Sequence, residues 1–168
     1  MFEIRVLMPD DAALFRALRL EALRTEPTAF GACYEETLER TESDFRAGIE
    51  NAAPGAVFGA FDGPVLVGMA GLKREDGRKS SHKGYMWGVY VAPSHRGRGV
   101  GRALAQAVID RAREIVVLLH CSVQAGNTQA ERLYESLGFS TYGLERKALC
   151  VDGVYYDEAH LALDFSTP

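Results

Sequence analysis

Several features that mark particular classes of protein are scarce or missing in this sequence. It has three cysteines among 168 residues, far apart and without a C-x-x-C pair. Neither a disulfide framework nor a thiolate metal site is therefore indicated, and we expect buried or incidental thiols. No stretch approaches the roughly 18 apolar residues of a membrane span, and the N-terminal MFEIRVLMPDD lacks a charged leader followed by an apolar run. We expect a cytoplasmic protein with no membrane partner.

An excess of positive charge is also missing. The chain has 19 Lys and Arg residues against 23 Asp and Glu residues, which gives a formal net charge of -4 at pH 7. Nucleic-acid binders usually carry a basic face over much of their surface, so we expect no nucleic-acid partner. The four histidines show no metal-ligand spacing and no H-E-x-x-H motif, so we expect no metal.

What is present is the composition of an ordinary globular domain. The chain is 47% hydrophobic and 25% charged, and its length is sufficient to bury one sizeable core. It contains no internal repeat, no low-complexity tract and no linker. We expect residues 1–168 to form a single domain.

Apolar periodicity and turn signals predict an α/β protein. The expected strands lie at 2–8, 56–61, 65–72, 84–91, 115–123, 139–150 and 154–164. The expected helices run from Asp10 or Asp11 to a point before Pro27, from Thr41 onward, over 99–113 and over 128–137.

Residues with short polar side chains are expected to begin the helices. Asp10 or Asp11 is the predicted N-cap of the first helix. Thr41 is the predicted N-cap of the second, with Asp44 at the position of a weaker capping box. The apolar positions of the first helix recur at intervals of four, at Leu14, Leu18 and Ala22.

The connections between strands predict how the sheet is paired. Asp62-Gly63-Pro64 indicates a hairpin, residues 74–83 an exposed polar loop, and Asp152-Gly153 a type I′ turn in a second hairpin. The strand–helix–strand unit at 84–123 requires a right-handed crossover and parallel pairing. A mixed sheet with helices on its faces is therefore expected.

The stretch HRGRGVGR at 95–102 lies between an expected strand and an expected helix. A helix start has unpartnered N–H groups and a fractional positive charge, so it binds anions where side chains leave room. Gly97, Gly99 and Gly101 provide that clearance. Charge that complements a pyrophosphate comes from Arg96, Arg98 and Arg102. The stretch predicts a diphosphate site.

Two common nucleotide motifs do not match this stretch. The dinucleotide fingerprint G-x-G-x-x-G needs glycine or alanine where Arg102 stands when counted from Gly97, and where Leu104 stands when counted from Gly99. The triphosphate loop G-x-x-x-x-G-K-[ST] does not occur in the chain. A dinucleotide enzyme is therefore disfavoured.

The run from Arg96 to Gly101 fits the pattern [QR]-x-x-G-x-[GA], which resembles the acyl-coenzyme A pyrophosphate loop of the GNAT superfamily of N-acetyltransferases. A second segment, Asn127-x-x-Ala130-x-x-Leu133-Tyr134-x-x-x-Gly138-Phe139, resembles the other characteristic stretch of that family.

The resemblance implies a mixed, largely antiparallel seven-stranded sheet flanked by about four helices. The sheet is splayed between its fourth and fifth strands, at 84–91 and 115–123, and coenzyme A lies in the opening. Acetyl-CoA is then the co-substrate. The residues expected to bind it are Val89, Tyr90, Val91, Arg96, Gly97, Arg98, Gly99, Val100, Gly101, Arg102, Asn127, Ala130 and Tyr134.

Acyl transfer from a thioester to an amine needs a neutral amine, donors to the oxyanion and a proton for the thiolate. The resemblance places the acid at Tyr134, whose phenol is protonated at neutral pH. An ordinary core tyrosine is the alternative reading of that residue. Asn127 is expected to bind coenzyme A, to cap the helix, or to do both.

The general base is where this chain departs from the pattern. Several members of the family carry a glutamate where Tyr85 stands, and 84–91 contains no carboxylate. Substrate contacts are expected from Tyr85 and from Glu35 and Glu36, which can attract a cationic amine. The candidates for the base are Glu35, Glu36, His82, Asp157 and Glu158.

Two functions of different class follow. The first is an enzyme that transfers the acetyl group of acetyl-CoA to a primary amine of a small molecule, a peptide or a protein. The second is a non-catalytic acyl-CoA sensor, because the missing strand carboxylate weakens only the catalytic case. RNA binding by the RGRG segment has poor support from the acidic composition. Dimers are common in the family, so a second copy of the chain is an expected partner.

Overall fold

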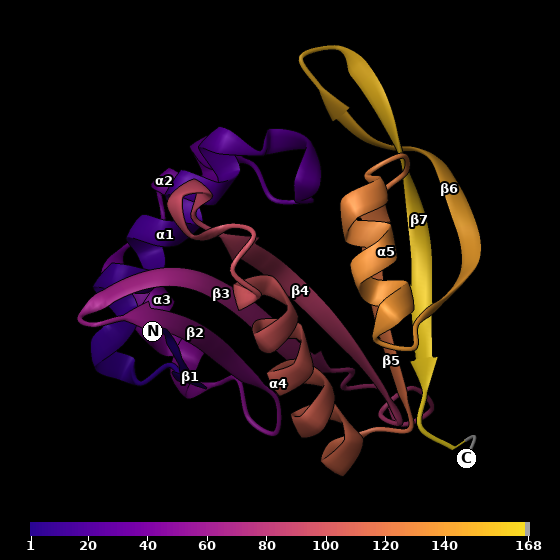
Figure 1. Ribbon diagram of the computed structural model, residues 1–168, viewed down its shortest axis with the longest axis horizontal. Helices are drawn as coiled ribbons and strands as arrows, with labels where there is room; N and C mark the ends of the chain where they lie inside the picture. The colour runs from indigo at the N-terminus through magenta and orange to yellow at the C-terminus, as the bar shows by residue number, and fades with distance from the viewer. Residues whose placement is uncertain (167–168) are drawn as a thin grey trace.

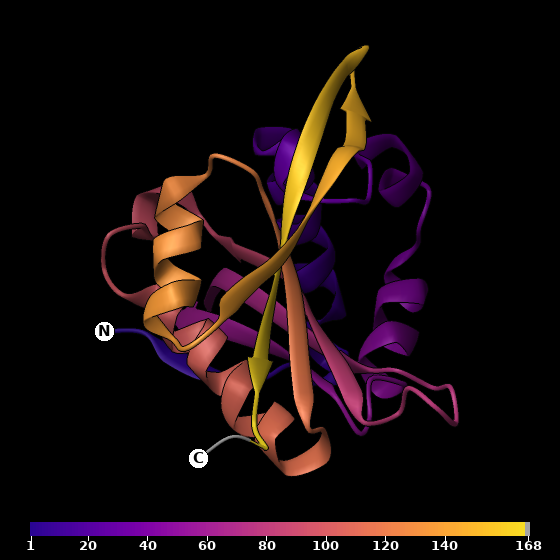
Figure 2. The same cartoon turned by 90° about the vertical axis from the view of Figure 1, so that its right-hand side faces the viewer.

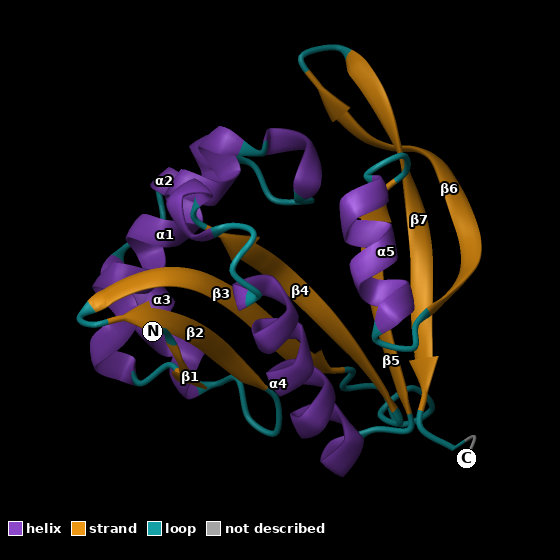
Figure 3. Cartoon of the chain, in the orientation of Figure 1, coloured by secondary structure: helices purple, strands orange, loops and turns teal. Residues whose placement is uncertain are grey.

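The computed structural model describes residues 1–166 and contains one mixed sheet of seven strands in the order β1-β2-β3-β4-β5-β7-β6 (Figures 1 and 3). Neighbouring strands are antiparallel except β4 and β5, which are parallel. The strands are β1 (Glu3–Val6), β2 (Ala56–Asp62), β3 (Val65–Arg74), β4 (Lys83–Val91), β5 (Leu118–Gln124), β6 (Ser140–Val151) and β7 (Val154–Asp164). The predicted fold class is confirmed.

Helices cover both faces of the sheet (Figures 1 and 2). One face carries α1 and α3, and the other carries α4 and α5, so the buried apolar residues form two clusters. The helices are α1 (Ala12–Thr25), α2 (Tyr34–Leu38), α3 (Glu42–Glu50), α4 (Val100–Ile115) and α5 (Thr128–Ser136), with 3₁₀ turns η1 (Pro9–Asp11), η2 (Pro27–Ala29) and η3 (Pro93–His95). Among residues 1–166, none of these helices has the length and apolarity that a bilayer crossing requires.

Helix α2 is an element that the sequence patterns did not predict. It has only five residues, and its N-cap is Cys33, whose thiol accepts a weak hydrogen bond from the Glu36 N–H at 3.5 Å. Cysteine is not among the usual capping residues, so no start signal was present. Glu35 and Glu36, predicted as substrate contacts, lie in the first turn of this helix.

The predicted inward face of α1 was wrong at one position. Leu14 is 41% exposed, whereas its neighbour Phe15 is buried. Phe15 packs edge-on against Phe45 of α3, with ring centroids 5.1 Å apart. Both i+3 and i+4 neighbours lie near one face of a helix with 3.6 residues per turn. In α1 the buried face contains Phe15, three residues before Leu18, and Leu14 lies at the edge of that face.

Helix caps agreed with the predictions at only one of the two early helices. Thr41 and Asp44 form the expected capping box of α3, with bonds of 3.2 Å and 2.7 Å. Asp11 stands at the N-cap position of α1 but makes no capping bond to it. Its carboxylate instead accepts the Met8 N–H and pairs with Arg5, both at 2.7 Å. The ion pair with Arg5 of β1, six residues away, and the bond to Met8 have replaced the expected cap.

The second hairpin has the predicted turn. Asp152 and Gly153 have φ values of 49° and 77°, and type I′ turns require both to be positive. One boundary differs, because α4 continues to Ile115 and β5 begins at Leu118 rather than at 115. The first residue of the apolar run at 115–123 is thus the last residue of α4, and the strand begins three residues later. The three cysteines have free thiols, of which only that of Cys121 is buried.

The sheet is splayed at the predicted place. The β4–β5 ladder joins only Lys83–Tyr85 to Leu118–His120, and beyond it the two strands diverge (Figure 1). On its other edge, β4 stays paired with β3 as far as Val91, with an irregularity near Gly88, whose φ is 63°. The far half of β4 therefore has one backbone edge open toward the splay.

Candidate active site

A groove of about 710 Å³ lies where the splay opens on the face of the sheet that carries α4 and α5. Residues from the end of β4, the start of α4, α5 and the turn η2 line it. They include all the predicted coenzyme-binding residues except Arg98: Val89, Tyr90, Val91, Arg96, Gly97, Gly99, Val100, Gly101, Arg102, Asn127, Ala130 and Tyr134. The two sequence motifs thus lie on two walls of one groove.

The start of α4 has the geometry of an anion site. The first bond of the helix joins the Ala103 N–H to the Gly99 carbonyl at 3.0 Å, so the preceding amides have no acceptor within the helix. Gly97 and Gly99 have φ values of 72° and 81°, and a Cβ on either would meet no heavy atom within 4 Å. Glycine both adopts this backbone and leaves the space before the amides open.

The predicted arginines are less free than the glycines. Arg96 donates to the Val91 carbonyl and pairs with Glu26, both at 3.0 Å. It therefore holds the loop against neighbouring elements. Arg102 donates to the Ser136 hydroxyl at 3.2 Å and remains at the groove, where Arg132 joins it. Arg132 was not predicted, because it stands at an unspecified position of the second motif.

A second cavity, of about 340 Å³, connects the two faces of the sheet through the splay. Asn127, Ala130 and Tyr134 of α5 line it from one face, and these three residues also line the groove. From the other face come Arg19, Phe30, Tyr85, Trp87, Ser122 and Glu158. The groove and the cavity therefore meet at Tyr134.

Tyr134 is 7% exposed and packs edge-on against Phe139, with ring centroids 5.6 Å apart. Burial raises the pKa of its phenol, and nearby Cys121 and Tyr85 raise it further, so the hydroxyl stays protonated at neutral pH. Asn127 caps α5 as predicted, because its side chain accepts the Ala130 N–H at 3.2 Å. The motif therefore places a protonated donor at the junction of the two spaces.

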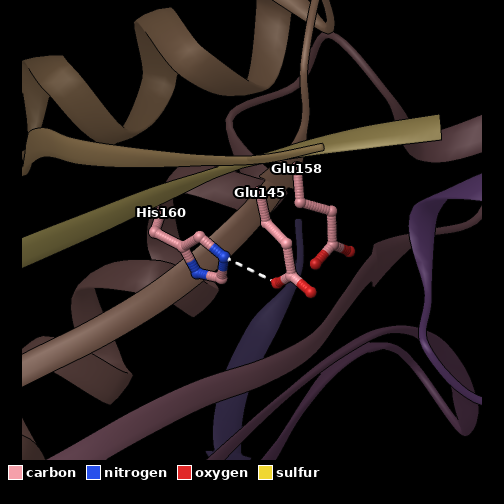
Figure 4. Close-up of side chains that lie close together, drawn as sticks. All are labelled: Glu145, Glu158 and His160. Carbon is pink, nitrogen blue, oxygen red and sulfur yellow. Dashed lines mark hydrogen bonds and ion pairs between the residues drawn. The ribbon is translucent and has the colours of Figure 1, made fainter. Parts of the chain in front are cut away.

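A chain of hydrogen-bonded polar side chains lies on the face of the sheet opposite α5, at the splay. The Tyr85 hydroxyl donates to Ser122 Oγ at 3.0 Å, and Ser122 Oγ lies 3.2 Å from His160 Nδ1. His160 Nε2 in turn lies 2.9 Å from a Glu145 oxygen (Figure 4). Burial raises the pKa of the Tyr85 phenol. Tyr85, predicted as a substrate contact, thus lines the cavity beside Tyr134.

Glu158 lies next to the His160–Glu145 pair (Figure 4). Ligand atoms of the three residues are within 4.8 Å of one another, a grouping that sequence spacing did not show because it joins β6 to β7. His160 already uses its Nε2 for Glu145, and the absence of a metal stays a prediction. Burial raises the pKa of Glu158, since desolvation disfavours the carboxylate.

Of the five predicted base candidates, Glu158 alone is among the residues of 1–166 that line the cavity with Tyr134. Glu35 lines a different pocket of about 390 Å³, between α2 and the tip of the β6–β7 hairpin. Asp157 accepts the Lys147 N–H at 2.7 Å. Glu36 and His82 do not line the cavity either.

The cavity is also lined by residues that the sequence analysis did not predict. Arg19 and Phe30 belong to an ordinary amphipathic helix and to the segment after it, and no motif distinguishes them. Their shared position at one cavity is set by how α1 packs on the sheet.

Comparisons with known proteins agree with this geometry. The model of the Acetyltransferase (GNAT) family matches residues 17–139. The N-alpha-acetyltransferase RimI of Mycobacterium tuberculosis is 40% identical over 95 residues, which are 56% of this chain. The chain spans only 58% of the length of that relative.

Solved structures share the fold over almost the whole chain. A ribosomal-protein-alanine N-acetyltransferase from Brucella melitensis has a TM-score of 0.85 and 26% identity, over 96% of this chain and 99% of the other. A Salmonella typhimurium protein, yncA, solved with its cofactor acetyl-CoA, has a TM-score of 0.88 and 21% identity, over 99% and 95%.

Proposed function

The chain belongs to the GNAT acetyltransferase family, and on that premise we propose that it transfers the acetyl group of acetyl-CoA to a primary amine. The observation that carries the proposal is the cavity that passes through the splayed sheet and meets the groove at Tyr134. A donor in the groove and an acceptor entering from the opposite face meet at one buried hydroxyl.

The groove suits the donor, which supplies an activated thioester. The unpaired amides at the start of α4, cleared by Gly97 and Gly99, bind a pyrophosphate, and Arg102 and Arg132 add positive charge. The open edge of β4 at Val89 to Val91 offers backbone groups to the pantetheine arm. The presence of acetyl-CoA in the Salmonella neighbour supports this assignment.

Glu158 is the proposed general base. It lines the cavity from the acceptor side, and its raised pKa makes it a stronger proton acceptor than an exposed carboxylate. An ammonium acceptor gives a proton to Glu158 and then attacks the thioester carbonyl. As the C–S bond breaks, Tyr134 protonates the departing thiolate, and its phenolate takes up the second proton of the former ammonium nitrogen. Glu158 releases the first proton to solvent.

The proposed acceptor is an amine of a small molecule, a peptide or a protein. The similarity to RimI, an N-alpha-acetyltransferase, and to the Brucella ribosomal-protein-alanine N-acetyltransferase supports an α-amino group of a polypeptide as one option. A polypeptide has room to bind there, because the pocket of about 390 Å³ beside the cavity extends toward the tip of the β6–β7 hairpin.

A thiol-release assay tests the proposal. The purified chain is incubated with acetyl-CoA and a panel of amines that includes amino acids, polyamines and N-terminal peptides, and free coenzyme A is measured. Amine-dependent release with an acetylated product by mass spectrometry is expected. Tight acetyl-CoA binding without release over the whole panel would instead identify the non-catalytic sensor.

A further inference from the structure

Arg19 is a cation without a carboxylate partner in the part of the chain that the structure describes. Its guanidinium carbon lies 4.9 Å from the centroid of the Phe30 ring and 5.7 Å from that of Trp87. Its Nη1 atom is buried and has no hydrogen-bond partner among residues 1–166. A guanidinium carries five N–H donors, and aromatic faces satisfy none of them by hydrogen bonding.

The position of Arg19 is costly without a ligand. Burial lowers its pKa to about 10, and the nearby Arg40 adds a smaller effect in the same direction, so the side chain is still charged at neutral pH. A buried donor without an acceptor loses its hydration without compensation. An anion that enters the cavity would supply the missing acceptor.

The guanidinium borders a cavity that an anion can enter. Arg19 lines the same space of about 340 Å³ as Tyr134, and its guanidinium lies against Gly88 of β4. A Cβ at Gly88 would lie 3.2 Å from Nη1, and the φ of 63° also favours glycine there. The glycine in the irregular part of β4 thus lets the guanidinium approach the strand backbone closely.

The opposite wall carries the opposite charge. Glu158 lines the cavity from β7, in the second half of the sheet, whereas Arg19 lines it from α1, which packs on the first half. Tyr134 lines the same cavity from the α5 face of the sheet and also lines the groove. The lining of the cavity therefore includes both a carboxylate and a guanidinium, contributed from the two halves of the sheet.

We propose that Arg19 forms an anion subsite, so that the acceptor is an amine that also carries a carboxylate. This inference rests on the proposed acetyl transfer and specifies its substrate class. The amine of the acceptor lies toward Glu158 and Tyr134, while its carboxylate receives the guanidinium N–H groups. A free amino acid and a peptide with an acidic first residue both present this chemistry.

Matched amines test the subsite directly. Leucine and glutamate are compared as acceptors with their amides, and peptides that begin with Glu are compared with the same peptides beginning with Gln. Each comparison is made with the wild type, Arg19→Gln and Arg19→Lys. Wild type is expected to favour the acid over the amide by about tenfold to a hundredfold in kcat/KM, as charge-assisted hydrogen bonds do. In Arg19→Gln the preference disappears through a higher KM for the acid, and Arg19→Lys keeps part of it.

A control variant separates the subsite from a packing role. Arg113 of α4 is an arginine of similar surroundings away from the cavity, because its guanidinium carbon lies 5.4 Å from the centroid of the Phe165 ring. Arg113→Gln is therefore the control. It is expected to leave the preference for the acid unchanged. Preference for free amino acids over peptides identifies the small-molecule source of the carboxylate, and the reverse identifies the peptide source.

The single tryptophan of the chain provides a second measurement that does not require turnover. Trp87 lies beside Arg19, so N-acetylleucine, added with coenzyme A, is expected to change its fluorescence saturably in wild type but not in Arg19→Gln. Equal rates with acids and amides, together with no fluorescence response, would overturn the subsite and leave acetyl transfer intact. Absence of acetylation with a normal fluorescence response would instead overturn the proposed function.

Discussion

The donor groove and the acceptor cavity meet at Tyr134 but are built in different ways. The groove is formed largely by two short continuous segments, at 95–102 and 127–134, and its central feature is backbone N–H groups. The cavity is lined by residues from parts of the chain that lie far apart in sequence: Arg19 of α1, the runs 29–32, 85–89 and 121–124, then Asn127, Ala130 and Tyr134, and Glu158 of β7. A site made of backbone needs glycines at regular spacing, so it is visible in a sequence, whereas a site made of scattered side chains is not.

The largest expected effect is on the groove, through Gly99→Val. The valine is strained at a φ of 81° and its side chain fills the space before the α4 amides. Calorimetry should show a dissociation constant for acetyl-CoA about a thousandfold higher, which corresponds to about 4 kcal/mol.

Gly153→Val is the matched control, because Gly153 has a φ of 77° in the β6–β7 turn, away from the groove. Both variants should unfold at a similarly lower temperature, and only Gly99→Val should lose acetyl-CoA. Equal acetyl-CoA affinity in the two variants would contradict the backbone cradle.

The next effect falls where the two regions meet, in Tyr134→Phe. Removal of the protonated hydroxyl should lower kcat about a hundredfold, as loss of a general acid does, while acetyl-CoA affinity stays within about twofold. Steady-state kinetics and calorimetry measure the two quantities. Tyr142→Phe, at a side chain 61% exposed, is the control. Wild-type turnover in Tyr134→Phe would exclude the assigned acid.

A smaller effect, with a distinct pH signature, is expected on the acceptor side. Burial raises the pKa of Glu158, so kcat/KM of the wild type should fall as the pH drops through that raised value, where the base becomes protonated. Glu158→Gln should lower the rate about tenfold at pH 7 and remove this acid limb.

Asp157→Asn is the control for that profile, because its carboxylate binds the Lys147 N–H and does not line the cavity with Tyr134. The acid limb should persist in Asp157→Asn. An unchanged limb in Glu158→Gln would assign the base elsewhere.

The smallest effect on activity is expected at Asp11, which lies in neither region. Arg5 and the Met8 N–H hold the pKa of this carboxyl below its usual range. Its contribution to stability is therefore present above the unfolded pKa and is lost as pH falls through the folded one. Asp11→Asn should lower the free energy of unfolding by about 1.5 kcal/mol at pH 7, because Arg5 is partly exposed.

Denaturant unfolding at several pH values measures this effect, and the difference from wild type should shrink in acid. Asp10→Asn is the matched control, since Asp10 pairs with Arg46 while 95% exposed and should contribute little. A loss of acetyl-CoA affinity in Asp11→Asn would show that the two regions are not independent of the N-terminal packing.

Errors in the sequence predictions share one physical cause. Leu14 has the correct spacing but lies outward, and Asp11 has the correct position for a cap but pairs with Arg5. In both, a contact outside the helix itself decided between local options of similar energy: Phe15 packs on Phe45 of α3, and Asp11 pairs with Arg5 of β1, six residues away. Thr41 had no such competitor, and its capping box formed as predicted.

The sequence by itself determined the order of the strands and of the four longer helices, the type I′ turn at Asp152-Gly153 and the open cradle before α4. These features depend on φ, on capping and on periodic burial, which act within a few residues of one another. Only the tertiary structure brought Tyr134, Glu158 and Arg19 to one cavity. Their proximity depends on where β4 and β5 part and on how α1 packs on the sheet, and such long-range contacts have no signature in local sequence.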